Sequence, residues 1–99
     1  MTPEGLVKAV VKKVLAKHAA YWHCPVQNGM GAPSLDFIGC HKSRFFSIET
    51  KAGKGQATPR QVQTAISMRS AGGRVFLINE ETGTAELERW LDEQVARNQ

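Results

Sequence analysis

Apolar and polar positions alternate with helical spacing over the first twenty residues of this 99-residue chain. Thr2 precedes Pro3, an order typical of a helix N-terminus, because proline suits the first helical position and a threonine hydroxyl can accept a free amide hydrogen bond. Glu4 follows in the first turn, where the helix dipole favours an anion. These residues predict an amphipathic helix with outward lysines, whose apolar stripe is Leu6, Val7, Val10, Val11, Val14 and Leu15.

Three short apolar runs follow this helix and predict three strands. The first run covers Ala20 to Val26, and the others cover Leu35 to Cys40 and Phe45 to Lys51. Residues 41–44 fit a four-residue connection, so we expect the second and third runs to form a hairpin.

The pairing of this hairpin decides where its charged side chains lie. If Cys40 pairs with Phe45, Asp36 lies directly opposite Glu49, with Cβ atoms about 4.5 to 5.5 Å apart. The two-residue period of a strand then places Lys51 on the same face as Glu49. We therefore expect two carboxylates and an ammonium group to converge at one end of one sheet face.

The second half of the chain repeats these signals. Thr58 and Pro59 again place a cap before a proline, and the helix they predict ends at Gly72-Gly73. Arg74 to Asn79 is a nearly continuous apolar run, which is typical of a strand inside a sheet. Thr84 to Arg97 predicts a last helix with a buried stripe of Leu87, Trp90, Leu91 and Val95.

The predicted order is therefore helix, three strands, helix, strand, helix. Residues 1–99 are enough for one domain and too few for two. The strand, helix, strand unit over residues 45–79 is expected to be a parallel crossover. We expect an α/β fold with a mixed sheet flanked by helices and a further helix at the C-terminal end.

Charge is distributed unevenly along the chain. Residues 1–79 contain eleven Lys and Arg but three acids, a formal charge of +8, whereas residues 80–99 contain six acids and two arginines, a charge of −4. A basic body of this kind favours a polyanionic partner. The three isolated acids are Glu4, Asp36 and Glu49.

The remaining features of the sequence indicate where in the cell the protein is expected. The chain has no run of eighteen apolar residues that could span a membrane, and its first helix lacks the apolar core of a secretory signal. Cys24 and Cys40 are too few for a disulfide framework, so we expect reduced thiols and an intracellular protein.

The three acids and the nearby lysine suggest a catalytic site. Opposed carboxylates repel unless a proton or a cation separates them, and oxygen ligands suit Mg²⁺ or Mn²⁺. A neighbouring lysine such as Lys51 can orient an attacking water and stabilise the charge of a phosphodiester transition state. Zinc is an alternative, with His23-Cys24 and Cys40-His41 as ligands, but their spacing favours buried cysteines that pack as small hydrophobes.

Asp36 followed by Glu49-Thr50-Lys51, within this order of elements, resembles the PD-(D/E)xK nuclease superfamily. The run from Lys51 and Gly53 to Thr58, Pro59 and Gln61 resembles its VRR-NUC domain, including the stand-alone phage-type members. The likeness covers residues 4–79, although Leu35 rather than proline precedes Asp36 and no adjacent pair of arginines follows a valine.

This resemblance implies a restriction-endonuclease-like core and a metal-dependent nuclease. By position, Asp36 and Glu49 would bind the metal, with the main-chain carbonyl of Thr50 as a further ligand and Glu4 reaching it through water. Lys51 would serve the water and the transition state, and Gln61 would orient the site. For the stand-alone members, the resemblance also implies a homodimer that acts on branched DNA such as Holliday junctions, in a bacterial or phage-infected cell.

The sequence thus predicts hydrolysis of DNA phosphodiesters with Mg²⁺ or Mn²⁺. Since one chain carries one site and cuts one strand, symmetric cleavage of a four-way junction requires two chains. The alternatives are a nucleic-acid-binding protein without turnover, and a nuclease for linear or flapped DNA within a larger assembly. The side chains expected to contact nucleic-acid phosphates are Lys8, Lys12, Lys42, Arg44, Lys54 and Arg60.

Overall fold

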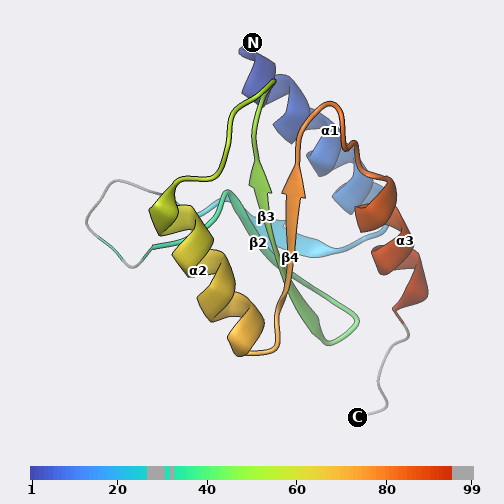
Figure 1. The fold of residues 1–99 in the computed structure, drawn as a ribbon. Coiled ribbons are helices and arrows are strands. Elements are labelled where there is room, and N and C mark those ends of the chain that lie inside the picture. The colour runs from blue at the N-terminus through green and yellow to red at the C-terminus, as the bar shows by residue number, and fades with distance from the viewer. Residues whose placement is uncertain (27–30, 32, 95–99) are drawn as a thin grey trace.

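The structure is a computed structural model that describes residues 1–26, 31 and 33–94. Its four-stranded mixed sheet and three helices follow the expected order, so the predicted α/β class is confirmed (Figure 1). The elements are α1 (Pro3–Lys17), β1 (Tyr21–His23), β2 (Phe37–His41), β3 (Arg44–Thr50), α2 (Pro59–Ser70), β4 (Arg74–Ile78) and α3 (Ala85–Glu93).

Helix α1 begins as its sequence predicts. The hydroxyl of Thr2 accepts a hydrogen bond from the amide of Gly5 at 3.0 Å, which satisfies one free donor of the first turn. The apolar stripe is narrower than predicted, because Leu6 and Val10 are about half exposed, at 56% and 51%. The side chains of α1 that are buried are Val7, Val11, Val14 and Leu15.

The predicted hairpin register is confirmed along the whole ladder between β2 and β3. Cys40 pairs with Phe45, and the ladder runs to Phe37 opposite Ile48. The four-residue connection is wrong, because His41 also pairs with Arg44 and leaves a two-residue turn. Both turn residues, Lys42 and Ser43, have positive φ, of 50° and 74°, which matches the twist of two-residue hairpins.

Strands β1, β2 and β3 are antiparallel, and β4 lies parallel to β3 as predicted. The strand order is β1-β2-β3-β4, so β4 is an edge strand, and the expectation that it lies inside the sheet is wrong. Its Leu77 is 52% exposed. The apolar run suggested an interior strand because most of its side chains are buried. Val75, Phe76 and Ile78 are buried against the helices, whereas Leu77 is not.

The sheet separates two layers of helix. Helices α1 and α3 lie on one face, and α2 lies on the other (Figure 1). The core cluster is formed by side chains of α1, α3, β2, β3 and β4, with Phe37, Phe46 and Ile48 fully buried. Helix α2 contributes no fully buried side chain, and its Val62 and Ile66 each remain 47% exposed.

The first strand is shorter than predicted, because only Tyr21 to His23 pair with β2. Tyr21 and Trp22 point in opposite directions, as a strand requires. Trp22 packs on Phe37 with ring centroids 5.6 Å apart, whereas Tyr21 is 69% exposed.

The last helix is also shorter than predicted, since it ends at Glu93 and Gln94 is extended. Leu87 and Leu91 are buried and Trp90 packs edge-on against Phe46 and Phe76, whereas Val95 lies outside the described residues. Acidic side chains of α3 pair with basic side chains of the body, so part of the charge asymmetry is neutralised internally. The ion pairs are Arg74–Glu86 and Lys17–Glu88, and Nε2 of His18 is hydrogen-bonded to Oδ1 of Asp92 at 2.8 Å.

The thiols of Cys24 and Cys40 are free, as predicted, but both side chains are exposed. The expectation that they are buried is wrong. Cys40 lies between Tyr21 of β1 and Phe45 of β3, in a row on the face away from the core where all three side chains are exposed. Across the described parts of the chain, every helix is too short or too polar to traverse a lipid bilayer.

Gly39 in the middle of β2 has a packing role that gives a testable prediction. A Cβ atom at this position would lie well under 3.0 Å from the carbonyl oxygen of Tyr21 and from the ring of Phe46. Because one neighbour is main chain and the other is fully buried, Gly39→Ala should lower the free energy of unfolding by about 2 kcal/mol or more. Urea denaturation measures this change. Gly31→Ala is the matched control, since a Cβ there meets nothing within 4 Å, and equal stability of the two variants would contradict the prediction.

Candidate active site

The predicted site residues lie where β3 ends. Both β3 and β4 point toward the end of the sheet at which α1 begins (Figure 1). Glu49 and Thr50 end β3, and Lys51 follows directly. Asp36 immediately precedes β2, one residue beyond the last pair of the hairpin ladder. The site is thus assembled from two strand ends and the first turns of two helices.

The carboxylate of Asp36 is held mainly by the end of β3. Its Oδ2 accepts hydrogen bonds from the main-chain amide of Thr50 at 2.9 Å and from the hydroxyl of the same residue at 2.8 Å. Its Oδ1 lies 3.8 Å from the ammonium nitrogen of Lys8. One carboxylate oxygen is therefore fixed by neutral donors, and the other faces a cation.

The carboxylate of Glu49 is almost fully enclosed, with its side chain 5% exposed. Its Oε1 accepts a hydrogen bond from the main-chain amide of Asp36 at 3.3 Å. Its Oε2 accepts one from the side-chain amide of Gln61 at 2.8 Å and lies 3.4 Å from the ammonium nitrogen of Lys51. The structure therefore brings Asp36, Glu49 and Lys51 together, as expected. The direct hydrogen bond between the two acids comes from the main-chain amide of Asp36, which lies one residue beyond the end of the hairpin ladder.

Gln61 caps the start of α2 and also hydrogen-bonds to Glu49. It forms a capping box with Thr58, whose hydroxyl accepts from the amide of Gln61 at 3.2 Å while the side-chain oxygen of Gln61 accepts from the amide of Thr58 at 2.9 Å. This pairing fixes which end of the side-chain amide is oxygen. The NH₂ group is then left to donate to Glu49. The start of α2 therefore orients the buried carboxylate.

The pKa of Glu49 is raised from 4.5 to about 7, chiefly by burial and then by the carboxylate of Asp36. Lys51 and the amide of Asp36 act in the opposite direction and limit this rise. A carboxyl group with such a pKa is half ionised near neutral pH, so a bound cation would displace its proton.

Glu4 and Lys8 reach the same region from α1. The ammonium nitrogen of Lys8 lies 3.5 Å from Oε2 of Glu4 and 3.8 Å from Oδ1 of Asp36. Lys8 therefore lies between two of the three isolated acids. Its place beside Asp36 was missed from the sequence, although its position four residues after Glu4 predicts their ion pair.

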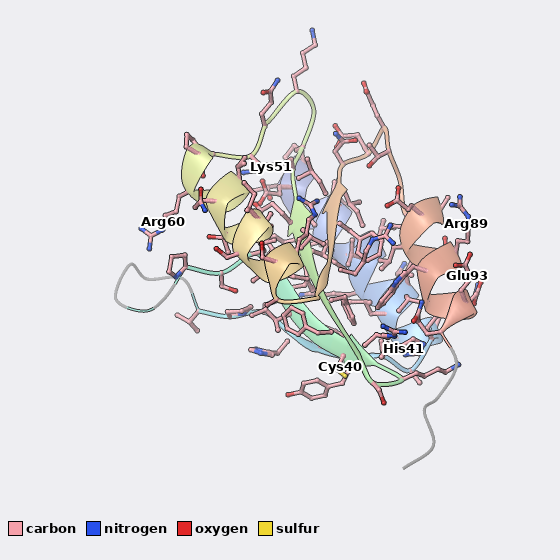
Figure 2. The ribbon with its side chains drawn as sticks, turned by 60° about the horizontal axis from the view of Figure 1, so that its bottom comes forward. Cys40, His41, Lys51, Arg60, Arg89 and Glu93 are labelled. Carbon is pink, nitrogen blue, oxygen red and sulfur yellow. The ribbon has the colours of Figure 1, made fainter. Side chains whose placement is uncertain are left out.

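Four of the expected phosphate-contacting residues form two groups. Lys54 lies in the loop between β3 and α2, and Arg60 points outward from the start of α2 (Figure 2). Lys42 and Arg44 belong to the hairpin turn at the other end of β3, about 20 Å from the site. The ammonium nitrogen of Lys12 is 6.0 Å from the centre of a Trp22 ring.

Two further contacts were not expected from the sequence. The hydroxyl of Thr50 holds Asp36, whereas the expected contribution of Thr50 was its carbonyl oxygen. The side chain of Glu80, which follows β4, accepts a hydrogen bond from the amide of Gly53 and so anchors the loop after Lys51. The loop geometry at Gly53, with φ of 56°, suits glycine.

The alternative zinc ligands are not arranged as a site. His41 is buried and donates from Nε2 to the carbonyl of Leu91 at 3.2 Å, and burial lowers its pKa. Cys40 is exposed and its neighbour His41 is buried, so the two side chains lie on opposite faces of β2 (Figure 2). Within the described residues, no three His, Cys, Asp or Glu side chains are grouped as metal ligands.

The donor set nevertheless fits a hard divalent cation. Only Asp36 and Glu49 are expected to bind it directly through side chains, since Thr50 would contribute a carbonyl and Glu4 would act through water. Two carboxylates with main-chain oxygen and water are the ligands that Mg²⁺ takes when substrate phosphates complete its coordination. The side chain of Glu49 is enclosed, so a cation bound beside its carboxylate would neutralise a charge that burial makes costly.

Comparisons with known proteins add no family assignment. A scan against protein-family models finds no match for this chain, and a search of curated proteins likewise finds none. The resemblance to VRR-NUC nucleases therefore rests on the residues of the site and on the order of the elements.

Proposed function

We propose that this protein is a metal-dependent endonuclease that hydrolyses DNA phosphodiesters. The observation that carries the proposal is the enclosed carboxylate of Glu49, held by Lys51, by Gln61 and by the amide of Asp36. A buried carboxylate beside a second one is costly, and a structural role alone would favour an apolar side chain at the end of β3. The basic body around it suits a phosphate backbone.

Each side chain then has a defined part in the reaction. Asp36 and Glu49 would hold Mg²⁺ or Mn²⁺, with the carbonyl of Thr50 and, through water, Glu4. When bound, the metal supplies Lewis-acid stabilisation of the phosphate oxygens. Lys51 would orient the attacking water and offset the charge that develops on the phosphate.

Other side chains keep this arrangement in place or bind the substrate. Gln61 keeps Glu49 in position through its tie to Thr58. Lys54 and Arg60, in the loop and at the helix start that follow Lys51, would contact the phosphates that flank the cut. Lys12, Lys42 and Arg44 lie farther along the molecule and would contact DNA away from the cut.

The substrate we favour is branched DNA, cut by a homodimer inside the cell. Two symmetric cuts in a four-way junction require two sites, and this chain provides one. The edge strand β4 and helix α2 offer apolar side chains that a second copy could cover, since Val62, Ile66 and Leu77 are each about half exposed. The alternatives are a DNA-binding protein without turnover and a nuclease for linear or flapped DNA in a larger assembly.

Cleavage assays test the proposal directly. Pure protein is incubated with linear duplex, flap and four-way junction DNA, each with Mg²⁺, Mn²⁺ or EDTA. We expect metal-dependent cutting that prefers the junction, and Lys51→Ala should lower it about a hundredfold or more while leaving the fold intact. Failure to cut any substrate with either metal would refute the proposal that the protein is an enzyme. Equal cutting of linear and branched DNA would remove only the junction preference, and a monomer by light scattering would remove the symmetric cut.

A further inference from the structure

Lys8 was expected to bind DNA, yet its ammonium group lies among the acids of the site. It is 3.5 Å from Glu4 and 3.8 Å from Asp36, and both distances end on carboxylate oxygens. We infer that Lys8 is a resident cation of the site, which competes with the divalent metal for Asp36 and is released when the metal binds. This inference rests on the proposed metal-dependent function.

The two oxygens of Asp36 differ in a way that supports this exchange. Oδ2 already accepts two short hydrogen bonds from Thr50, so it is fixed toward β3. Oδ1 is the oxygen nearest to Lys8. A metal that uses Oδ1 would place a second cation within a few ångströms of the ammonium group, where the two repel strongly in a partly enclosed site. Lys8 must therefore move away for the metal to bind well.

Lys8 is able to move, whereas the other lysine of the site is held more tightly. The side chain of Lys8 is 36% exposed, and that of Lys51 is 16% exposed beside the enclosed Glu49. The flexible four-carbon stem of a lysine lets its ammonium group swing into solvent. Glu4, at 40% exposed, would be freed by the same movement and could then meet a metal-bound water.

Charge supports the same conclusion. With Glu49 ionised, three carboxylates face the ammonium groups of Lys8 and Lys51, so the cluster carries a net charge of −1. Adding a divalent cation while both lysines stay would reverse this sign. Release of Lys8 would bring the net charge of the cluster with its metal to zero. It would also leave the ammonium group of Lys8 free to contact a DNA phosphate. The side chain would thus act as a positioning residue that links metal binding to substrate binding.

The test is a measurement of Mn²⁺ affinity by electron paramagnetic resonance or calorimetry, without DNA. Lys8→Met should bind Mn²⁺ about tenfold more tightly than the wild-type protein, because the competing cation is gone. Lys8→Arg keeps the charge and should stay within about twofold of wild type. Lys13→Met, which removes an exposed lysine of the same helix, should also resemble wild type. Circular dichroism confirms that each variant is folded.

Unchanged or weaker Mn²⁺ binding by Lys8→Met would overturn the inference, and so would an equal gain by Lys13→Met, since that would be a general charge effect. If wild-type protein binds Mn²⁺ and cuts DNA while Lys8→Met shows no gain, the inference fails and the nuclease survives. If neither wild type nor Lys8→Met binds Mn²⁺, and wild type cuts nothing, both fail together.

Discussion

Replacement of Asp36 by asparagine should abolish metal-dependent DNA cleavage while leaving the protein folded. Asparagine keeps a carbonyl oxygen that can accept both hydrogen bonds from Thr50, so the end of β3 stays in place. It loses the negative charge that a divalent cation requires. The loss of a metal ligand should cost about 4 kcal/mol of transition-state stabilisation, which is about a thousandfold in rate. Single-turnover cleavage of junction DNA in Mg²⁺ and Mn²⁺ measures this change.

The matched control for Asp36→Asn is Glu93→Gln, which removes a carboxylate from the exposed outer side of α3 (Figure 2). Its cleavage rate should equal that of wild type. Calorimetry with Mn²⁺ should show that Asp36→Asn has lost metal affinity while Glu93→Gln has kept it. Cleavage by Asp36→Asn within about tenfold of wild type would show that Asp36 does not hold the metal.

The neighbourhood of the site could be predicted because it depends on local rules. The conjectured pairing of Cys40 with Phe45 sets the hairpin register, and that register places Glu49 near Asp36. The start of α2 follows from the capping signals of Thr58 and Pro59. Both rules act over a few residues, so no tertiary information is required.

Features that depend on packing between distant elements could not be predicted in the same way. The edge position of β4 depends on how many strands join the sheet, which its own apolar run does not reveal. The half-exposed side chains of α1 follow from the width of the contact with the sheet and α3, so Leu6 and Val10 look buried in the sequence alone. The contact between Lys8 and Asp36 joins α1 to the start of β2, across 28 positions of sequence.

Gln61 illustrates how fold and site are coupled in so small a protein. A capping glutamine is a helix signal, and its hydrogen bond to Glu49 makes the same side chain part of the site. The position of the buried carboxylate therefore depends on where α2 begins. With few residues available, one side chain stabilises a helix terminus and orients a charged group.

Glu49→Gln should change how the stability of the metal-free protein depends on pH. The pKa of Glu49 is about 7 in the folded protein, above its ordinary value of 4.5, chiefly because of burial and then the charge of Asp36. The folded state therefore binds more protons than the unfolded state between these values. The stability due to the protonated group is full below about pH 4.5 and is lost as pH rises through about 7.

Glutamine cannot ionise, so the variant lacks this loss. Between about pH 5 and about pH 8, the free energy of unfolding of the wild-type protein should fall by up to about 3 kcal/mol relative to Glu49→Gln. Urea denaturation in EDTA at both pH values measures the difference. A glutamine at position 49 also offers one acceptor oxygen in place of two, which costs about 1 kcal/mol at every pH and does not affect the slope.

The comparison between the two proteins isolates Glu49 from the histidines. Burial lowers the pKa of His41, so its contribution to stability is full above about pH 6.5 and is lost as pH falls, which is opposite in sign to that of Glu49. Because His41 is present in both proteins, its effect cancels in the difference. Glu93→Gln should keep the wild-type slope. Parallel pH profiles for wild type and Glu49→Gln would mean that Glu49 is ionised at little cost without metal, and the main physical reason for placing a cation beside it would be lost.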